Sequence, residues 1–200
     1  MRAPAPHQLA LWTLLALPGA VVVGRYATGA SGYGEALQVS GDWSVRWLIV
    51  ALAATPLRLA FPRAGWPMWL LRRRRDIGVA TFAYALLHLA VYLGKKAQAP
   101  MLIVREAIDP GMAVGWIAFV VLAALAITSN DASVRWLRAG WKTLHRLVYP
   151  AAVLALAHWL LTAFDLRHGL VHVAILAAIE AARIVLQRRR PGSGAGSRAG

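Results

Sequence analysis

The sequence predicts an all-α membrane protein, a bundle of six transmembrane helices with short loops and both termini in the cytoplasm. Hydrophobic residues make up 59% of the 200 residues, and the mean hydropathy is +0.55, which is too apolar for a soluble domain. A bilayer core of about 30 Å needs roughly 20 apolar residues in a helix. Six segments meet this need: approximately 8–24, 45–61, 77–94, 111–128, 147–164 and 169–186.

The first segment leaves an alternative open. Arg2 precedes it and small residues close it, as in a secretory signal peptide. Its apolar part is long for the hydrophobic region of such a peptide, which favours a retained transmembrane helix.

The cations lie unevenly on alternate loops, and this sets the orientation. Lys and Arg prefer cytoplasmic loops, so the side that carries 16 of the 22 is expected to be the inner one. These 16 are Arg2, Arg58, Arg63, Arg72–Arg75, Arg135, Arg138, Lys142, Arg146, Arg183, Arg188–Arg190 and Arg198. The net charge of +14 is therefore attributed to contact with the lipid bilayer, and no nucleic-acid partner is expected.

Two absences in the sequence limit the chemistry. The chain has no cysteine, which excludes disulfides, thiolate-ligated haem and cysteine-held iron–sulfur clusters. No glycine-rich dinucleotide motif follows a strand pattern, so no NAD(P)H-binding module is expected. Redox chemistry would have to come from a bound cofactor.

Two histidines lie deep within predicted membrane spans. His88 and His158 are each the twelfth residue of an uncharged 18-residue run, which places both about 16 Å along their helices at 1.5 Å per residue. An ionisable side chain at this depth is costly and is usually retained for a function. Because neutral imidazole is a common haem ligand, the pair predicts one haem between the two helices. The alternative is that each histidine only hydrogen-bonds another helix.

Neighbouring residues fit this haem hypothesis. Tyr84 and Tyr92, at i−4 and i+4 from His88, share its helix face and are expected to contact the cofactor. Ala85 and Ala155, each three residues before a histidine, leave room for it.

A second cofactor on the cytoplasmic side is an open question. His145 lies 13 residues before His158, about 20 Å along a helix, and the matching depth on the other span is held by Arg75. Two alternatives remain, a haem with His145 and a different second ligand, or a flavin near the Arg72–Arg75 run. That run is either a topological anchor or, through Arg74 and Arg75, a binding site for the phosphate or propionates of a cofactor.

Four runs of sequence resemble a known family. They are ATPLR (54–58), RRDIGVATFAYALLHLAVY (74–92), AITSNDASVRW (126–136) and WKTLHRLVYPAAVLALAHW (141–159). They are similar to the MsrQ (YedZ) family, the haem-binding membrane subunits of bacterial periplasmic methionine-sulfoxide reductase systems. That family belongs to the ferric-reductase-like transmembrane group, and the resemblance covers about residues 45–165.

The resemblance implies a multi-pass protein of the bacterial cell inner membrane that binds haem b and, as a second cofactor, FMN. It implies that His88, His145 and His158 are haem-iron ligands. It also implies electron delivery to a periplasmic molybdopterin-dependent methionine-sulfoxide reductase, the catalytic subunit that repairs oxidised proteins. The donor would be the quinone pool or a cytosolic flavin reductase. The family's basic-aromatic motif in the outer loop between the third and fourth spans is replaced here by AIDPGMAVG (107–115).

These observations divide the chain into four parts. Residues 1–44 form the first transmembrane helix and outer loop, 45–165 the haem-binding core, 166–187 the sixth helix and 188–200 a disordered basic cytoplasmic tail. The predicted function is that of a non-catalytic electron-transfer subunit. Two alternatives stand beside it, a stand-alone ferric, metal or quinone reductase and a cofactor-free transporter.

Overall fold

The predicted all-α class is confirmed by a computed structural model, which describes residues 6–163 and 166–188. All regular structure in these residues is helical. The helices are α1 (Pro6–Ala27), α2 (Tyr33–Ala60), α3 (Gly65–Lys96), α4 (Pro100–Ala107), α5 (Pro110–Ile127), α6 (Asp131–Leu137), α7 (Ala139–His145), α8 (Val148–Thr162) and α9 (Leu166–Arg188). Apart from Arg188, the predicted basic tail lies outside the described residues.

Five segments of the described chain are long and apolar enough to cross a membrane. They are His7–Ala27, Gly65–Lys96, Pro110–Ile127, Ala139–Thr162 and Gly169–Arg188. The predicted second span, 45–61, falls on the second half of α2 and on Phe61, and α2 is not among these five candidates. Arg46 and Arg58 lie within this stretch and lower its hydropathy. The structure therefore establishes five candidate spans, and the six-span topology stays a prediction.

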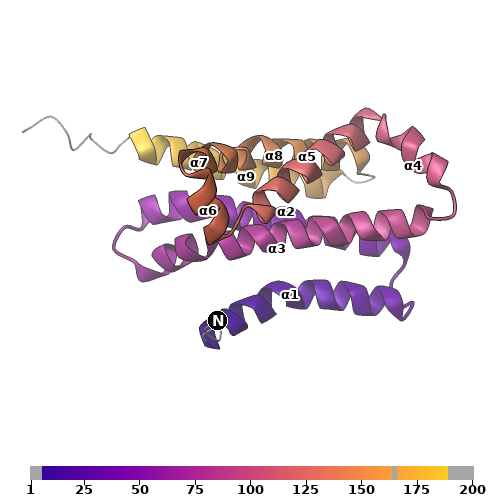
Figure 1. Cartoon of the computed structure of the whole chain (residues 1–200), viewed down its shortest axis with the longest axis horizontal. Coiled ribbons are helices and arrows are strands. Elements are labelled where there is room, and N and C mark those ends of the chain that lie inside the picture. Colours follow the sequence, from indigo (N-terminus) through magenta and orange to yellow (C-terminus); the bar gives the residue numbers. More distant parts are fainter. Residues whose placement is uncertain (1–5, 164–165, 189–200) are drawn as a thin grey trace, which may run out of the picture.

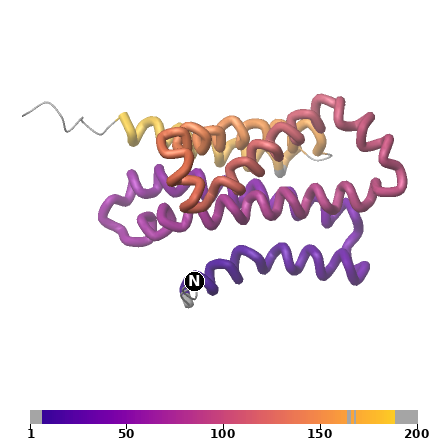
Figure 2. The backbone as a smooth tube through the Cα atoms, viewed as in Figure 1, coloured from indigo at the N-terminus to yellow at the C-terminus, as the bar shows by residue number. Residues whose placement is uncertain are grey.

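The long helices run side by side, and α5 crosses the others obliquely (Figures 1 and 2). The start of α1 and the end of α9 lie at the same end of the bundle as α6 and α7 (Figure 1). We call this the inner end, following the predicted orientation, and the opposite end, which carries α4, the outer end.

Helix α2 lies at the centre of the packing. One buried cluster joins Leu48 of α2 to Leu156 of α8 and Leu176 of α9. Two others join α2 to α1 and α3, through residues such as Ala51 and Ala36. Helix α2, whose composition is the least typical of a membrane span, is thus the helix against which α1, α3, α8 and α9 pack.

The sides of the helices that face away from the core of the bundle are apolar, as lipid contact requires. Leu14 on α1 is 60% exposed, Val120 on α5 is 64% exposed and Val153 on α8 is 63% exposed. Large exposed apolar surfaces of this kind are rare on water-soluble monomers, and they agree with the candidate spans.

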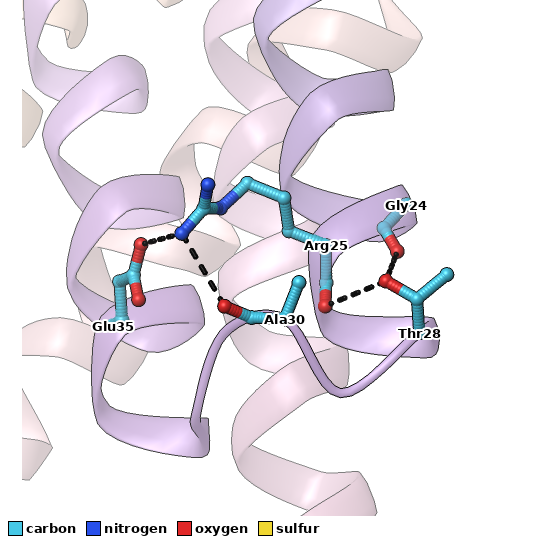
Figure 3. A network of polar contacts seen from close by, with 5 residues as sticks. All are labelled: Gly24, Arg25, Thr28, Ala30 and Glu35. Carbon is cyan, nitrogen blue, oxygen red and sulfur yellow. Dashed lines mark hydrogen bonds and ion pairs between the residues drawn. The ribbon is translucent and has the colours of Figure 1, made fainter.

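A short turn fixes the end of α1 to the start of α2 (Figure 3). The Arg25 guanidinium donates to the Ala30 carbonyl at 3.3 Å and to a Glu35 carboxylate oxygen at 3.1 Å, and the Thr28 hydroxyl donates to the Gly24 carbonyl at 2.8 Å. Gly29 adopts φ +73°, a conformation that glycine reaches without strain. The ion pair is half exposed and contributes at most about 1 kcal/mol.

A tyrosine from α3 completes the hydrogen bonding of α1 next to a proline. Pro18 lies inside α1 and cannot donate to the preceding turn. One residue later, the Gly19 N–H donates to the Tyr84 hydroxyl at 2.7 Å, and that hydroxyl donates to the Leu15 carbonyl at 2.8 Å. Tyr84 thus takes the place of a direct Gly19–Leu15 bond and ties α1 to α3.

The segment that carries His145 and His158 is not one continuous helix. It is interrupted at residues 146–147, between α7 and α8. Pro150 has no N–H for the Arg146 carbonyl, which accepts from the Tyr149 N–H instead, at 3.2 Å. The short helices α4, α6 and α7 lie where the sequence predicts loops.

We predict that Tyr84→Phe lowers the free energy of unfolding by about 1–2 kcal/mol, because the Gly19 N–H and the Leu15 carbonyl lose a buried partner. The measurement is a reversible unfolding curve in detergent. Tyr26→Phe is the control, since Tyr26 lies near the end of α1 and its hydroxyl makes no hydrogen bond to the described residues. Equal stability of the two variants would contradict the role assigned to the Tyr84 hydroxyl.

Candidate cofactor sites

The structure brings His88 of α3 and His158 of α8 together. Their ring centroids lie 6.2 Å apart and the ring planes are nearly perpendicular, at 87°. Both line a cavity of about 530 Å³ between α2, α3, α5 and α8, which we call the outer cavity.

Each imidazole is fixed by a hydrogen bond to the backbone of a neighbouring helix. Nδ1 of His88 lies 2.9 Å from the Leu37 carbonyl of α2, and Nδ1 of His158 lies 2.8 Å from the Gly111 carbonyl of α5. Since a carbonyl only accepts, each Nδ1 carries the hydrogen and each Nε2 keeps a free lone pair. A hydrogen bond from the other ring nitrogen to a carbonyl is typical of histidines that bind a metal.

The outer cavity has a largely apolar wall and a few polar groups. Ala85 and Ala155 line it, as expected from the sequence, and Tyr92 and Lys96 line it toward the outer end of α3. The indole Nε1 of Trp116 is buried there without a hydrogen-bond partner. A buried donor without a partner is rare, and this indole N–H has no acceptor among the described residues.

These residues fit a haem. His88 and His158 would hold the iron of such a group through Nε2, and their ring centroids, 6.2 Å apart, lie close enough for one metal ion to bind both rings at metal–nitrogen distances of about 2 Å. The volume lies within the range of about 300–1,000 Å³ that is usual for cofactor sites. The free Nε2 atoms, the apolar wall and the Trp116 donor are all consistent with this group.

A polar cluster joins α4 to the outer end of α3. The Tyr92 hydroxyl donates to Glu106 at 2.7 Å, and Lys96 forms an ion pair with the other oxygen of the same carboxylate. The bond from Lys96, followed by that from Tyr92, lowers the pKa of Glu106 below its ordinary value of 4.5. The cluster holds the short helix α4 beside the outer cavity.

Tyr84, predicted from the sequence to contact the cofactor, lies elsewhere. It shares a helix face with His88, but its hydroxyl is bonded to α1 and it does not line the outer cavity. Its described contacts are therefore structural.

The other predicted residues gather in a second cavity of about 500 Å³, which we call the inner cavity. It is lined by the Arg72–Arg75 run, including Arg74 and Arg75, and by His145, Trp141 and Ser129. Arg75 donates to Asp131 at 2.6 Å and lies 5.9 Å from the centre of the Trp141 ring. This pairing lowers the pKa of Asp131.

His145 is held differently from the two deeper histidines. Its ring stacks on Trp141 with centroids 3.9 Å apart, and its Nε2 lies 3.2 Å from the Thr128 hydroxyl. That hydroxyl has one hydrogen, which it gives to the Ala124 carbonyl at 2.7 Å, so Nε2–H of His145 is the donor to Thr128. In this rotamer His145 presents Nδ1 for a ligand, whereas His88 and His158 present Nε2.

Sequence reasoning missed the groups that orient the histidines. The carbonyls of Leu37 and Gly111 are backbone atoms with no sequence signal of their own, and Leu37 lies outside the predicted second span. Trp116 is one of nine tryptophans in the sequence, and nothing in the sequence marks it as a cofactor contact. The signal that could have found them is the helical spacing Leu37–Gly41 and Gly111–Gly115.

The comparisons with known proteins agree with this architecture. Residues 40–156 match the family described as the ferric reductase like transmembrane component. The chain belongs to this ferric reductase-like transmembrane family. No solved structure matches it.

The curated relatives are more specific. The chain is 37% identical over 159 residues to the protein-methionine-sulfoxide reductase heme-binding subunit MsrQ of Xanthomonas campestris pv. campestris, covering 78% of this chain and 71% of the relative. It is 41% identical over 162 residues to the protein of the same name from Rhodospirillum rubrum, covering 76% of this chain and 74% of the relative. Within the family, the chain is MsrQ-like.

We predict an acid-dependent release of α4. The pKa of Glu106 is depressed, so its ion pair stabilises the outer end at pH values above 4.5 and is lost as pH falls through the lowered pKa. Protease cleavage within α4 should therefore rise on acidification. Glu106→Gln should give fast cleavage already at neutral pH and remove the acid step.

Glu35→Gln is the matched control, because it changes a half-exposed carboxylate at the outer end of α2. That variant should keep the acid step in α4. An unchanged cleavage profile in Glu106→Gln would contradict the proposed fixation of α4.

Proposed function

We propose that the chain is the haem-binding electron-transfer subunit of a bacterial methionine-sulfoxide reductase system. The observation that carries the proposal is the pair of histidines in the outer cavity, both of which keep Nε2 free. The similarity to the MsrQ relatives, which are named as heme-binding subunits of protein-methionine-sulfoxide reductases, supports it. Residues 45–165 would form the haem-binding core.

His88 and His158 would hold a haem b through Nε2. When bound, the haem supplies one-electron chemistry at its iron. The residues of this chain bind and orient: each Nδ1–H···O=C bond fixes a ring and raises the basicity of its Nε2. Trp116 would donate to a polar group of the cofactor, and the apolar wall would exclude water.

The inner cavity would hold a second cofactor at the electron-entry side. Arg74 and Arg75 suit an anionic group, the phosphate of FMN or the propionates of a second haem, and His145 lines the same cavity beside them. The present rotamer of His145 favours the flavin, because Nε2 is already used by Thr128. An iron ligand at this position would need either Nδ1 or release from Thr128.

The direction of transfer follows from the proposed orientation. Both described chain ends lie at the arginine-rich end (Figure 1), which supports six crossings with the termini in the cytoplasm. Electrons would enter there from the quinone pool or a cytosolic flavin reductase. They would leave at the outer end to a periplasmic molybdopterin-dependent reductase, which places the chain in the inner membrane.

We predict that His88→Ala and His158→Ala each abolish the low-spin haem spectrum or convert it to high spin, because each removes one axial ligand. Absorption and electron paramagnetic resonance spectra of the purified variants measure this. His145→Ala is the control and should keep the low-spin signal of the outer site. An unchanged low-spin spectrum in both single variants of the deep histidines would refute the proposed ligation.

We also predict that a reporter fused after Gln187 is active only if it functions in the cytoplasm, because the arginines cluster at that end. A fusion within the 97–99 turn before α4 should show the opposite behaviour. Periplasmic reporter activity after Gln187 would reverse the orientation.

A further inference from the structure

Each histidine of the outer cavity packs against a glycine on the helix that accepts its hydrogen bond. A Cβ added at Gly41 of α2 would lie 3.0 Å from Nδ1 of His88. A Cβ added at Gly115 of α5 would lie 2.6 Å from Nδ1 of His158 and 2.8 Å from its Cε1. No other residue type leaves the rings this space.

The glycine and the accepting carbonyl have the same spacing on both helices. Leu37 precedes Gly41 by four residues, and Gly111 precedes Gly115 by four residues. Residues four apart lie on one helix face, so the carbonyl oxygen and the missing side chain face the same ring. The ring approaches the backbone at the glycine and donates to the carbonyl one turn earlier.

We propose that Gly41 and Gly115 are positioning residues for the two haem ligands. The missing Cβ lets each imidazole reach its carbonyl, and the bond formed there selects the tautomer with Nε2 free. This inference rests on the proposed function as far as haem is concerned. The packing itself is a property of the protein alone.

The two glycines differ in how much space they leave. At 2.6 Å a side-chain carbon cannot coexist with the His158 ring, so Gly115→Ala must push that ring off the Gly111 carbonyl. At 3.0 Å a shift of a few tenths of an ångström accommodates the carbon, so Gly41→Ala should be milder. Gly115→Ala is therefore expected to displace its histidine more than Gly41→Ala does.

The first test measures the haem-loaded protein. Gly115→Ala should lower haem affinity about 10- to 100-fold, the usual effect of losing the partner that orients a metal-binding histidine, and should shift the low-spin signal. Gly41→Ala should show a smaller change in the same direction. Gly94→Ala is the control, because Gly94 is an exposed α3 position whose added Cβ meets nothing within 4 Å.

The second test needs no haem. In the apoprotein, Gly115→Ala should lower the melting temperature through the clash with His158. The double variant with His158→Ala should recover part of that loss, because the clashing ring is gone. A purely structural role of Gly115 at the α5–α8 contact predicts additive losses instead.

The outcomes separate the two proposals. Additive melting losses, together with wild-type haem affinity in Gly115→Ala, would overturn the role of the glycines even if His158→Ala loses the haem. Recovery in the double variant, combined with low-spin haem retained in both histidine variants, would support the glycine packing and overturn the haem assignment. If Gly115→Ala does not accumulate, Gly41→Ala paired with His88→Ala gives the same cycle.

Discussion

The outer site depends on the lack of water in the bilayer, where a polar group must find its partner inside the protein. His88 and His158 find theirs in the backbone carbonyls of Leu37 and Gly111. The Ser44 hydroxyl likewise donates to the Thr81 carbonyl at 3.0 Å. Each of these bonds joins two helices, so the contacts that satisfy the buried polar groups also set the positions of α2, α3, α5 and α8 around the outer cavity.

The two cavities differ because their surroundings differ. The outer one is walled by apolar side chains, and its histidines are bonded only to main-chain carbonyls, which leaves Nε2 free. The inner one lies at the cationic end, where Trp141 and Thr128 already engage both the face and the Nε2 of His145. The first arrangement suits a metal-bound macrocycle and the second suits an anionic group. This contrast gives a physical basis for the proposal that the two cavities hold unlike groups.

The sequence was sufficient for the parts of the fold that depend on hydropathy. Five of the predicted spans correspond to candidate membrane spans, and His88 and His158 do share a cavity. It missed the first half of α2, because residues such as Glu35, Ser40 and Asp42 do not form an apolar run. Helix periodicity predicted the face of α3 on which Tyr84 lies, but not which helix packs against that face. The Tyr84 hydroxyl is hydrogen-bonded to the Leu15 carbonyl and the Gly19 N–H of α1, beside Pro18.

The segment 107–115, which the resemblance predicts to differ from the family's motif, has a structural use that the sequence did not reveal. Asp109 caps α5 by accepting from the Gly111 N–H at 2.9 Å, and the Gly111 carbonyl then accepts from His158. The start of α5 is thereby fixed against α8 at the place where one ring must approach the backbone. A bulky basic or aromatic residue at Gly111 would meet Thr162 and Leu161, to which an added Cβ lies within 3.1 and 3.2 Å. In this chain the close packing of α5 on α8 therefore disfavours a bulky side chain at position 111.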